Sequence, residues 1–129
     1  MAQYHAHVYF TSEQSDVAKS LFERIGAHEF PQLSAHKIFY ARVGPHPLPM
    51  IEFHFDHKNK SQCIQWLSDH HKSLSTLIHL DTGNNLRDHT CDVVWLGVPL
   101  PIDFSFFELL KSRPELTVHP AQSGIIPAK

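Results

Sequence analysis

Residues 4–10 read YHAHVYF, and their strict alternation is typical of a β-strand with two different faces. The alternation assigns His5, His7 and Tyr9 to one face and Ala6, Val8 and Phe10 to the other. The apolar face predicts contact with a hydrophobic core. The opposite face is polar and aromatic, so it is the first candidate for a functional surface.

The residues after this first strand predict two helices and three further strands. Thr11 and Gln14 form a potential capping box for a helix over residues 13–25, and Gly26 is a natural end for it. Strands are expected at residues 36–42, 50–55 and 74–80, and a second helix begins at Asn59 or Ser61. In the third strand, Glu52 and His54 share the polar face with Met50.

This element order predicts an α+β fold of the ferredoxin-like βαββαβ type, with a four-stranded antiparallel sheet and helices on one face. The first and third strands would be central, with the fourth beside the first and the second beside the third. We expect a single domain over residues 1–129, with a core at about 4–97 and a C-terminal extension at about 98–129. A short helix at 104–111 would help to cover the free face of the sheet.

Composition excludes several classes of protein. The net charge is −2 and the basic residues are scattered, so neither nucleic acid nor a membrane is an expected partner. No apolar run is long enough to span a membrane, and MAQYHAHVYF lacks the pattern of a secretion signal, so we expect a cytoplasmic location. The two cysteines, Cys63 and Cys91, are expected to be reduced and buried.

Histidine is strongly enriched, with 12 in 129 residues. Five of them lie in polar or terminal contexts and are expected at the surface: His28, His57, His70, His71 and His119. Others lie at strand ends and turns, where imidazoles can converge on a metal or transfer protons near neutral pH.

The predicted topology brings several of these histidines together. We expect the first and third strands to run in the same direction and the fourth to run opposite to them. The start of the first strand, the turn before the third and the end of the fourth would then share one edge of the sheet. His5 or His7, His46 and His79 would converge there, with Glu52 nearby.

Two or three histidines and a carboxylate around an open face are the ligands of a non-haem Fe(II) site, and the same residues suit zinc. His7 and His79 are the strongest ligand candidates; His46, fixed among three prolines, is a ligand, a neighbour of the ligands or a substrate contact. A metal-free acid/base or binding pocket, and a purely structural role in a polar sheet face or subunit interface, are the alternatives.

The chain also resembles the DOPA 4,5-dioxygenase family of fungi and its bacterial relatives. The similarity lies in YHAHVYF, VGPHPLPM running into IEF, LSTLIH, TGNNLRDH and WLG, in matching order from about residue 4 to residue 97. The matching motifs contain four histidines, His7, His46, His79 and His89. The chain departs from the family before LSTL and after His79, where relatives commonly have Arg-Gly-Gly and a proline.

The resemblance implies a dimeric ferredoxin-like α+β protein that opens catechol rings such as DOPA with Fe(II) and O2. On this hypothesis His7 and His79 bind Fe(II) with His46 or Glu52 as third ligand, although zinc or another divalent metal can occupy such a site in a purified sample. His89 or His46 would transfer protons, with Asp88 orienting His89, while Tyr9, His5 and His54 would contact the substrate. The alternatives are a non-catalytic dimeric module that binds a small molecule or metal, and a zinc-dependent hydrolase or isomerase.

Overall fold

The computed structural model describes residues 2–112. Its strands and α-helices are β1 (Gln3–Tyr9), α1 (Ser15–Gly26), β2 (Ser34–Phe39), β3 (Met50–Asp56), α2 (Lys60–His70), β4 (Thr76–Asp81), α3 (Asn85–Asp88), β5 (Val94–Leu96) and α4 (Ser105–Ser112). Two short 3₁₀ helices, η1 (Ser12–Gln14) and η2 (His57–Asn59), precede α1 and α2. These elements confirm the predicted βαββαβ order and add β5.

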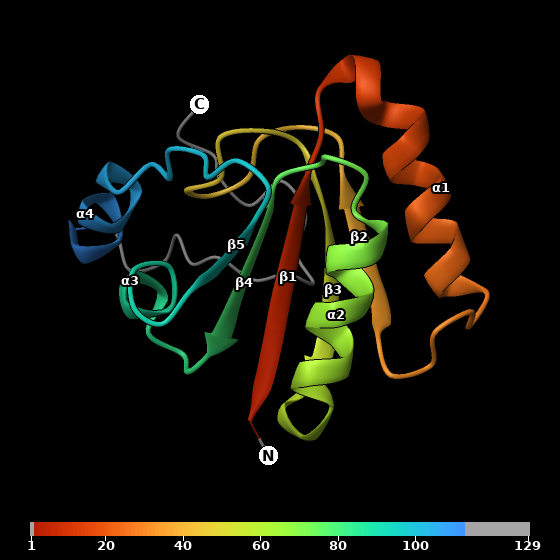
Figure 1. Ribbon diagram of the computed structural model, residues 1–129. Helices are drawn as coiled ribbons and strands as arrows, with labels where there is room; N and C mark the ends of the chain where they lie inside the picture. Colours follow the sequence, from red (N-terminus) through yellow and green to blue (C-terminus); the bar gives the residue numbers. More distant parts are fainter. Residues whose placement is uncertain (1, 113–129) are drawn as a thin grey trace.

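The sheet has the order β2-β3-β1-β4-β5, which contains the predicted ferredoxin-like arrangement (Figure 1). Every pair of neighbouring strands is antiparallel. The expectation that β1 and β3 run in the same direction is therefore wrong. The crossovers through α1 and α2 make β1 parallel to β2 and β3 parallel to β4, which leaves β1 and β3 opposed. The sheet described here has five strands rather than four, because residues 94–96 pair with β4.

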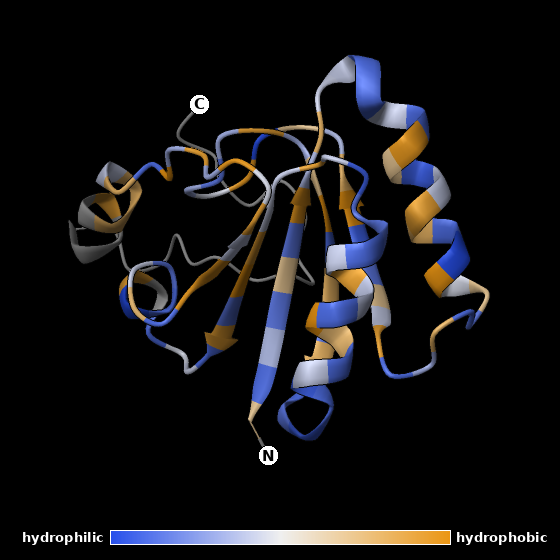
Figure 2. Ribbon diagram, in the orientation of Figure 1, coloured by the Kyte–Doolittle hydropathy of each residue, from blue (hydrophilic) through white to orange (hydrophobic). Residues whose placement is uncertain are grey.

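One face of the sheet packs against α1 and α2. The apolar residues of β1 and β3 lie in this core, with Ala18, Leu21 and Ile25 of α1 and Cys63 and Leu67 of α2. Figure 2 shows β1 alternating between hydrophilic and hydrophobic residues along its length. The predicted division between the two faces of β1 and β3 is thus confirmed.

The opposite face of the sheet is covered near β4 and β5 by the segment that contains α4. Ile102 and two α4 residues, Phe106 and Phe107, pack with Tyr9 and Leu77 in a second apolar cluster. Figure 1 shows α3 and α4 beyond β4, on the opposite side of the view from α1. The expected helix at 104–111 is present as α4, while residues 113–129 of the expected extension lie outside the described part of the chain.

A β-bulge interrupts β2. Ala35 pairs with Phe53 and Lys37 pairs with Glu52, so His36 is the extra residue between them. A bulge residue has no partner across the ladder and often re-aims a side chain near a site. Here the bulge accompanies a stacking of His36 against His54 of β3, at 4.3 Å between ring centroids.

Local signals explain the helix starts. The backbone N–H of Thr11 donates to Gln14 Oε1 at 2.9 Å, as the capping box predicted. Asp56 accepts from the backbone N–H of Lys58 at 3.0 Å and so caps η2. No helix within residues 2–112 is long and apolar enough to cross a membrane.

Candidate metal centre

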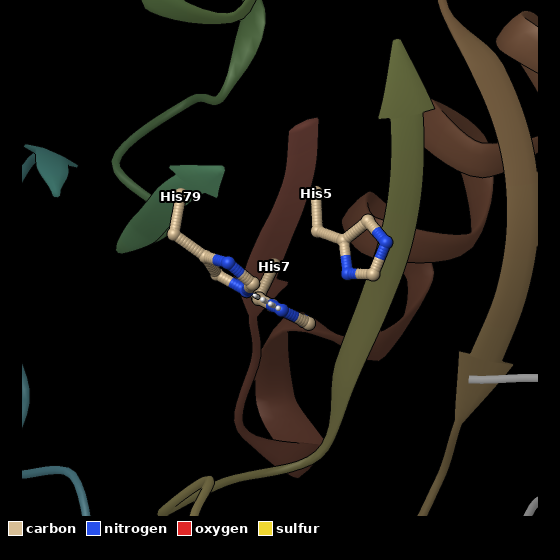
Figure 3. A group of neighbouring side chains, drawn as sticks. All are labelled: His5, His7 and His79. Carbon is tan, nitrogen blue, oxygen red and sulfur yellow. Dashed lines mark hydrogen bonds between the residues drawn. The ribbon is translucent and has the colours of Figure 1, made fainter. Parts of the chain in front are cut away.

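Three strands deliver histidines to the face opposite α1 and α2. His5 and His7 come from β1, and their register neighbours include His54 on β3 and His79 on β4. His5, His7 and His79 are all buried, and Figure 3 shows their rings gathered above the sheet. The cross-strand pairing of β1 with both neighbours therefore builds the centre of the site.

A direct contact joins His7 Nε2 to His79 Nε2, at 2.9 Å (Figure 3). His79 Nδ1 lies 3.0 Å from the carbonyl oxygen of Leu80. A carbonyl can only accept, so Nδ1 carries the hydrogen of the neutral ring and Nε2 presents a lone pair.

The surroundings of His7 favour the same tautomer. Its Nδ1 lies 3.1 Å from the sulfur of Met50 and 3.6 Å from Glu52 Oε1, both of which are acceptors. With the hydrogen on Nδ1, the Nε2 lone pair of His7 faces that of His79. Two nitrogens that bind one cation at about 2.1 Å and at right angles are ~3 Å apart, so the pair fits a shared divalent metal.

Two groups of three histidines offer nitrogens that all lie within 4.8 Å of one another. One group is His5, His7 and His79, and the other is His7, His46 and His89. Since His7 belongs to both, it is the centre of the cluster. Imidazole groups of this kind suit zinc, iron, copper and nickel.

Glu52 lies on the Nδ1 side of the His7 ring, whereas His79 lies on its Nε2 side. One oxygen accepts from His54 Nε2 at 2.6 Å, and the other faces His7 Nδ1. The carboxylate is also 3.9 Å from His5 Nδ1, and Glu52, His5 and His54 form a third group with metal-binding spacing. The predicted proximity of Glu52 to the histidines is therefore observed.

His46 reaches the cluster from the turn before β3. Because β1 and β3 are antiparallel, this turn lies at the end of β1, not at its start as we expected. The ring of His46 nevertheless lies 4.3 Å from that of His7, and Tyr9 Oη is 2.7 Å from His46 Nδ1. His46 Nε2 is buried and has no hydrogen-bond partner within residues 2–112, so it is available to a ligand.

His89 follows α3 and lies against the same cluster, 4.4 Å from the ring of His79 and 5.2 Å from that of His46. The two oxygens of Asp88 accept from the backbone N–H of Thr82 at 2.9 Å and from its hydroxyl at 2.5 Å. These contacts tie α3 to the end of β4. Asp88 therefore helps to position the segment that carries His89, while its predicted direct orientation of the His89 ring remains a prediction.

Burial keeps the central imidazoles neutral. Burial, followed by the neighbouring His54 and His79, lowers the pKa of His5 to about 2. Burial also lowers the pKa of His7 and His46 well below 6.5, and that of His79 less because the Leu80 carbonyl opposes it. Neutral imidazole is the form that binds metals.

Sequence reasoning missed two members of this environment, His36 and Met50. The position of Met50 on an otherwise polar strand face was the available signal, whereas the bulge hid the face of His36.

The histidines expected at the surface only partly lie there. His28 and His57 are exposed, but His70 and His71 are half-buried, and their Nδ1 atoms are hydrogen-bonded to the carbonyl oxygens of Trp66 and Leu74. His119 lies outside the described residues.

One cysteine also differs from expectation. Cys63 is buried, and burial raises the pKa of its thiol to about 12, while Cys91 is exposed. Both are free thiols, as expected.

The fold and the site define a ferredoxin-like α+β protein whose second sheet face carries a buried histidine cluster that fits a divalent metal. Residues 4–106 match the model of the Dopa 4,5-dioxygenase family, and the chain belongs to that family. The resemblance seen in the sequence motifs is thereby confirmed.

Two other proteins are similar to this chain. The crystal structure of a proposed dioxygenase from Nostoc punctiforme PCC 73102 matches with a TM-score of 0.76 and 33% identity, over 85% of this chain and 94% of that one. An uncharacterized 21.2 kDa protein of Botryotinia fuckeliana is 35% identical over 118 residues. That alignment covers 83% of this chain and 64% of the relative, so the chain spans less than two thirds of the relative's length.

Proposed function

We propose that this protein is a non-haem Fe(II) extradiol dioxygenase that opens a catechol-type aromatic ring with O2. The observation that carries the proposal is the pair of Nε2 atoms of His7 and His79, which face each other with both tautomers set by contacts at Nδ1. Family membership and the proposed dioxygenase from Nostoc punctiforme support the same reaction class.

His7 and His79 would hold the metal, with His5 as the third nitrogen of their group. The sequence predicted His46 or Glu52 as the third ligand. The geometry favours His5, because Glu52 faces the opposite side of the His7 ring and His46 falls into the group with His7 and His89 rather than with His79. Bound Fe(II) supplies open coordination positions and the electron transfer that O2 chemistry requires.

The chain's own residues would move protons. In the tautomer whose Nδ1–H donates to Tyr9 Oη, the buried Nε2 of His46, which has no hydrogen-bond partner within residues 2–112, presents a lone pair. That nitrogen would take a proton from a catechol hydroxyl and return it as the ring opens. Tyr9 fixes the orientation of that ring through His46 Nδ1, and burial with nearby Glu52 raises the Tyr9 pKa well above 10, which keeps its hydroxyl protonated. His89 is the second candidate for proton transfer, through its position against His79 and His46.

Substrate contacts remain proposals. His54 and the apolar cluster around Tyr9 and Phe107 would bound the substrate ring, with Tyr9 contributing its ring edge. Extradiol cleavage puts both oxygen atoms of O2 into the ring-opened product, so the reaction needs no external reductant. A homodimer and a cytoplasmic location are further predictions, to be measured by light scattering of the purified protein and by cell fractionation.

The test begins with protein loaded with Fe(II) under anaerobic conditions. It is then mixed with O2 and a panel of catechols, including DOPA, catechol and protocatechuate, while oxygen uptake and the yellow ring-opened product are recorded. We expect turnover by the wild type and loss of both metal and turnover in His7→Ala and His79→Ala. His28→Asn is the matched control, since His28 is exposed and Asn tolerates its positive φ of 64°.

Full metal content and full turnover in both alanine variants would contradict the ligand assignment. Bound iron without turnover of any catechol would favour the non-catalytic binding module. Purification with stoichiometric zinc and no iron-dependent oxygen uptake would favour the zinc-dependent hydrolase or isomerase.

A further inference from the structure

Glu52 is a buried carboxylate surrounded by imidazoles. It is 1% exposed, and the imidazole nitrogens within 4.0 Å of its oxygens, among residues 2–112, belong to His5, His7 and His54. A buried carboxylate is costly unless its oxygens are matched by donors. The sequence proposed it as a metal ligand, but its two oxygens have other partners.

The two oxygens of Glu52 divide between two rings. His54 Nε2 donates to Oε2 at 2.6 Å, which fixes the carboxylate. Oε1 lies 3.6 Å from His7 Nδ1, on the side of the ring away from His79. This separation exceeds a hydrogen bond, and Nδ1 has its hydrogen bond to the Met50 sulfur at 3.1 Å, so Glu52 acts on the ring through its charge. Metal-bound histidines commonly have a carboxylate in this position, where it sets the tautomer and raises the basicity of the ligating nitrogen.

We propose that Glu52 is a positioning residue that holds His7 in the metal-binding tautomer, and that His54 anchors it. A cation bound at Nε2 would make the Nδ1–H side of the His7 ring more positive, and the Glu52 carboxylate 3.6 Å away would stabilise that charge. The negative charge of Glu52 thereby strengthens metal binding without occupying a coordination position.

The anchor is itself held between two other rings. His54 stacks on His5 at 4.2 Å and on His36 at 4.3 Å, with interplanar angles of 16° and 19°. The bulge in β2 places His36 at this point. The three-ring stack fixes the plane of His54 and so aims its Nε2–H at Glu52, which gives a role to the residue that sequence reasoning missed.

This inference rests on the proposed metal site and is tested by metal affinity. Wild type, Glu52→Gln and His54→Phe are titrated anaerobically with Fe(II), and with Co(II) and Zn(II), against a competing chelator. Glu52→Gln keeps the shape of the side chain and removes its charge. His54→Phe keeps the stack and removes the donor, and the half-buried position of His54 makes this variant the less disruptive one.

We expect affinity to fall about 10- to 100-fold in Glu52→Gln and by a smaller factor in His54→Phe. The visible absorption bands of bound Co(II) should keep their shape and intensity, because the ligand set is unchanged. Glu29→Gln, which breaks a surface ion pair with Arg24, is the matched control and should bind as the wild type does.

Unchanged affinity in both site variants would overturn the inference. So would a Co(II) spectrum in Glu52→Gln that indicates a lost ligand, since Glu52 would then coordinate the metal directly. If the wild type itself binds none of these metals, the proposed function fails, and that result is distinct from both of the others.

Discussion

Tyr9 Oη lies 2.7 Å from His46 Nδ1 and joins the end of β1 to the proline-rich turn before β3. The turn is fixed from two further sides. The backbone N–H of His46 donates to the Val43 carbonyl at 3.2 Å, and the N–H of Asp103 donates to the Pro45 carbonyl at 2.8 Å. His46 is thus a rigidly placed imidazole whose other nitrogen has no hydrogen-bond partner in the described part of the chain.

Replacing Tyr9 with Phe should separate proton transfer from metal binding. The change leaves buried His46 Nδ1 without its partner, which should cost about 1–3 kcal/mol of stability. We expect kcat to fall about tenfold, corresponding to the loss of one orienting hydrogen bond, with metal content unchanged. Tyr40→Phe, at a position 61% exposed, is the control. A Tyr9→Phe enzyme with wild-type kcat would show that Tyr9 does not orient the proton-transfer group.

Substitutions at Thr82 and Asp88 can distinguish a structural role of Asp88, fixing α3, from a direct role in orienting His89. Thr82→Val removes the hydroxyl donor to Asp88 but leaves the carboxylate in place. If Asp88 acts by fixing α3, Thr82→Val and Asp88→Asn should both lower stability by about 1 kcal/mol and lower kcat in parallel. Urea unfolding and steady-state rates measure this. A kcat that falls only in Asp88→Asn would point to direct orientation of His89.

The sequence predicted which face of β1 carries the histidines because side chains alternate strictly along a regular strand. The same reasoning failed at His36, where the bulge between Ala35 and Lys37 breaks the alternation. It also missed β5, whose three residues are too few to give a periodic pattern.

The direction of β3 relative to β1 depends on the crossover through α1 and the hairpin to β3, which alternation along a single strand does not report. His46 and His7 nevertheless meet, although through the turn at the other end of β1. Their proximity therefore follows from the path of the proline-rich turn over the sheet face, a tertiary feature that strand patterns do not contain.

A large-to-small substitution in the core between the sheet and the helices should lower stability strongly without altering a residue of the histidine cluster. Phe53 of β3 is fully buried and stacks on Phe22 at 6.2 Å. Phe53→Ala should lower the free energy of unfolding by about 3–5 kcal/mol, because it removes the burial of the ring and leaves a cavity. Phe104→Ala, at a position 49% exposed, should cost less than about 1 kcal/mol. Chemical denaturation of both variants checks this, and equal losses would contradict the assigned core.

The buried histidines predict how the stability of the metal-free protein depends on pH. Burial lowers the pKa of His5, His7, His46 and His79 in the folded state, so the unfolded chain, with histidine pKa near 6.5, binds more protons. Stability is therefore fully present above about pH 6.5 and falls as the pH drops below it. Each histidine that stays neutral contributes a slope of about 1.4 kcal/mol per pH unit in that range. Urea unfolding of metal-free protein between pH 8 and pH 5 should show this decline, and His5→Gln should make it shallower. A stability that is flat or rises toward pH 5 would mean that these rings are charged in the folded protein and do not present the lone pairs that a metal requires.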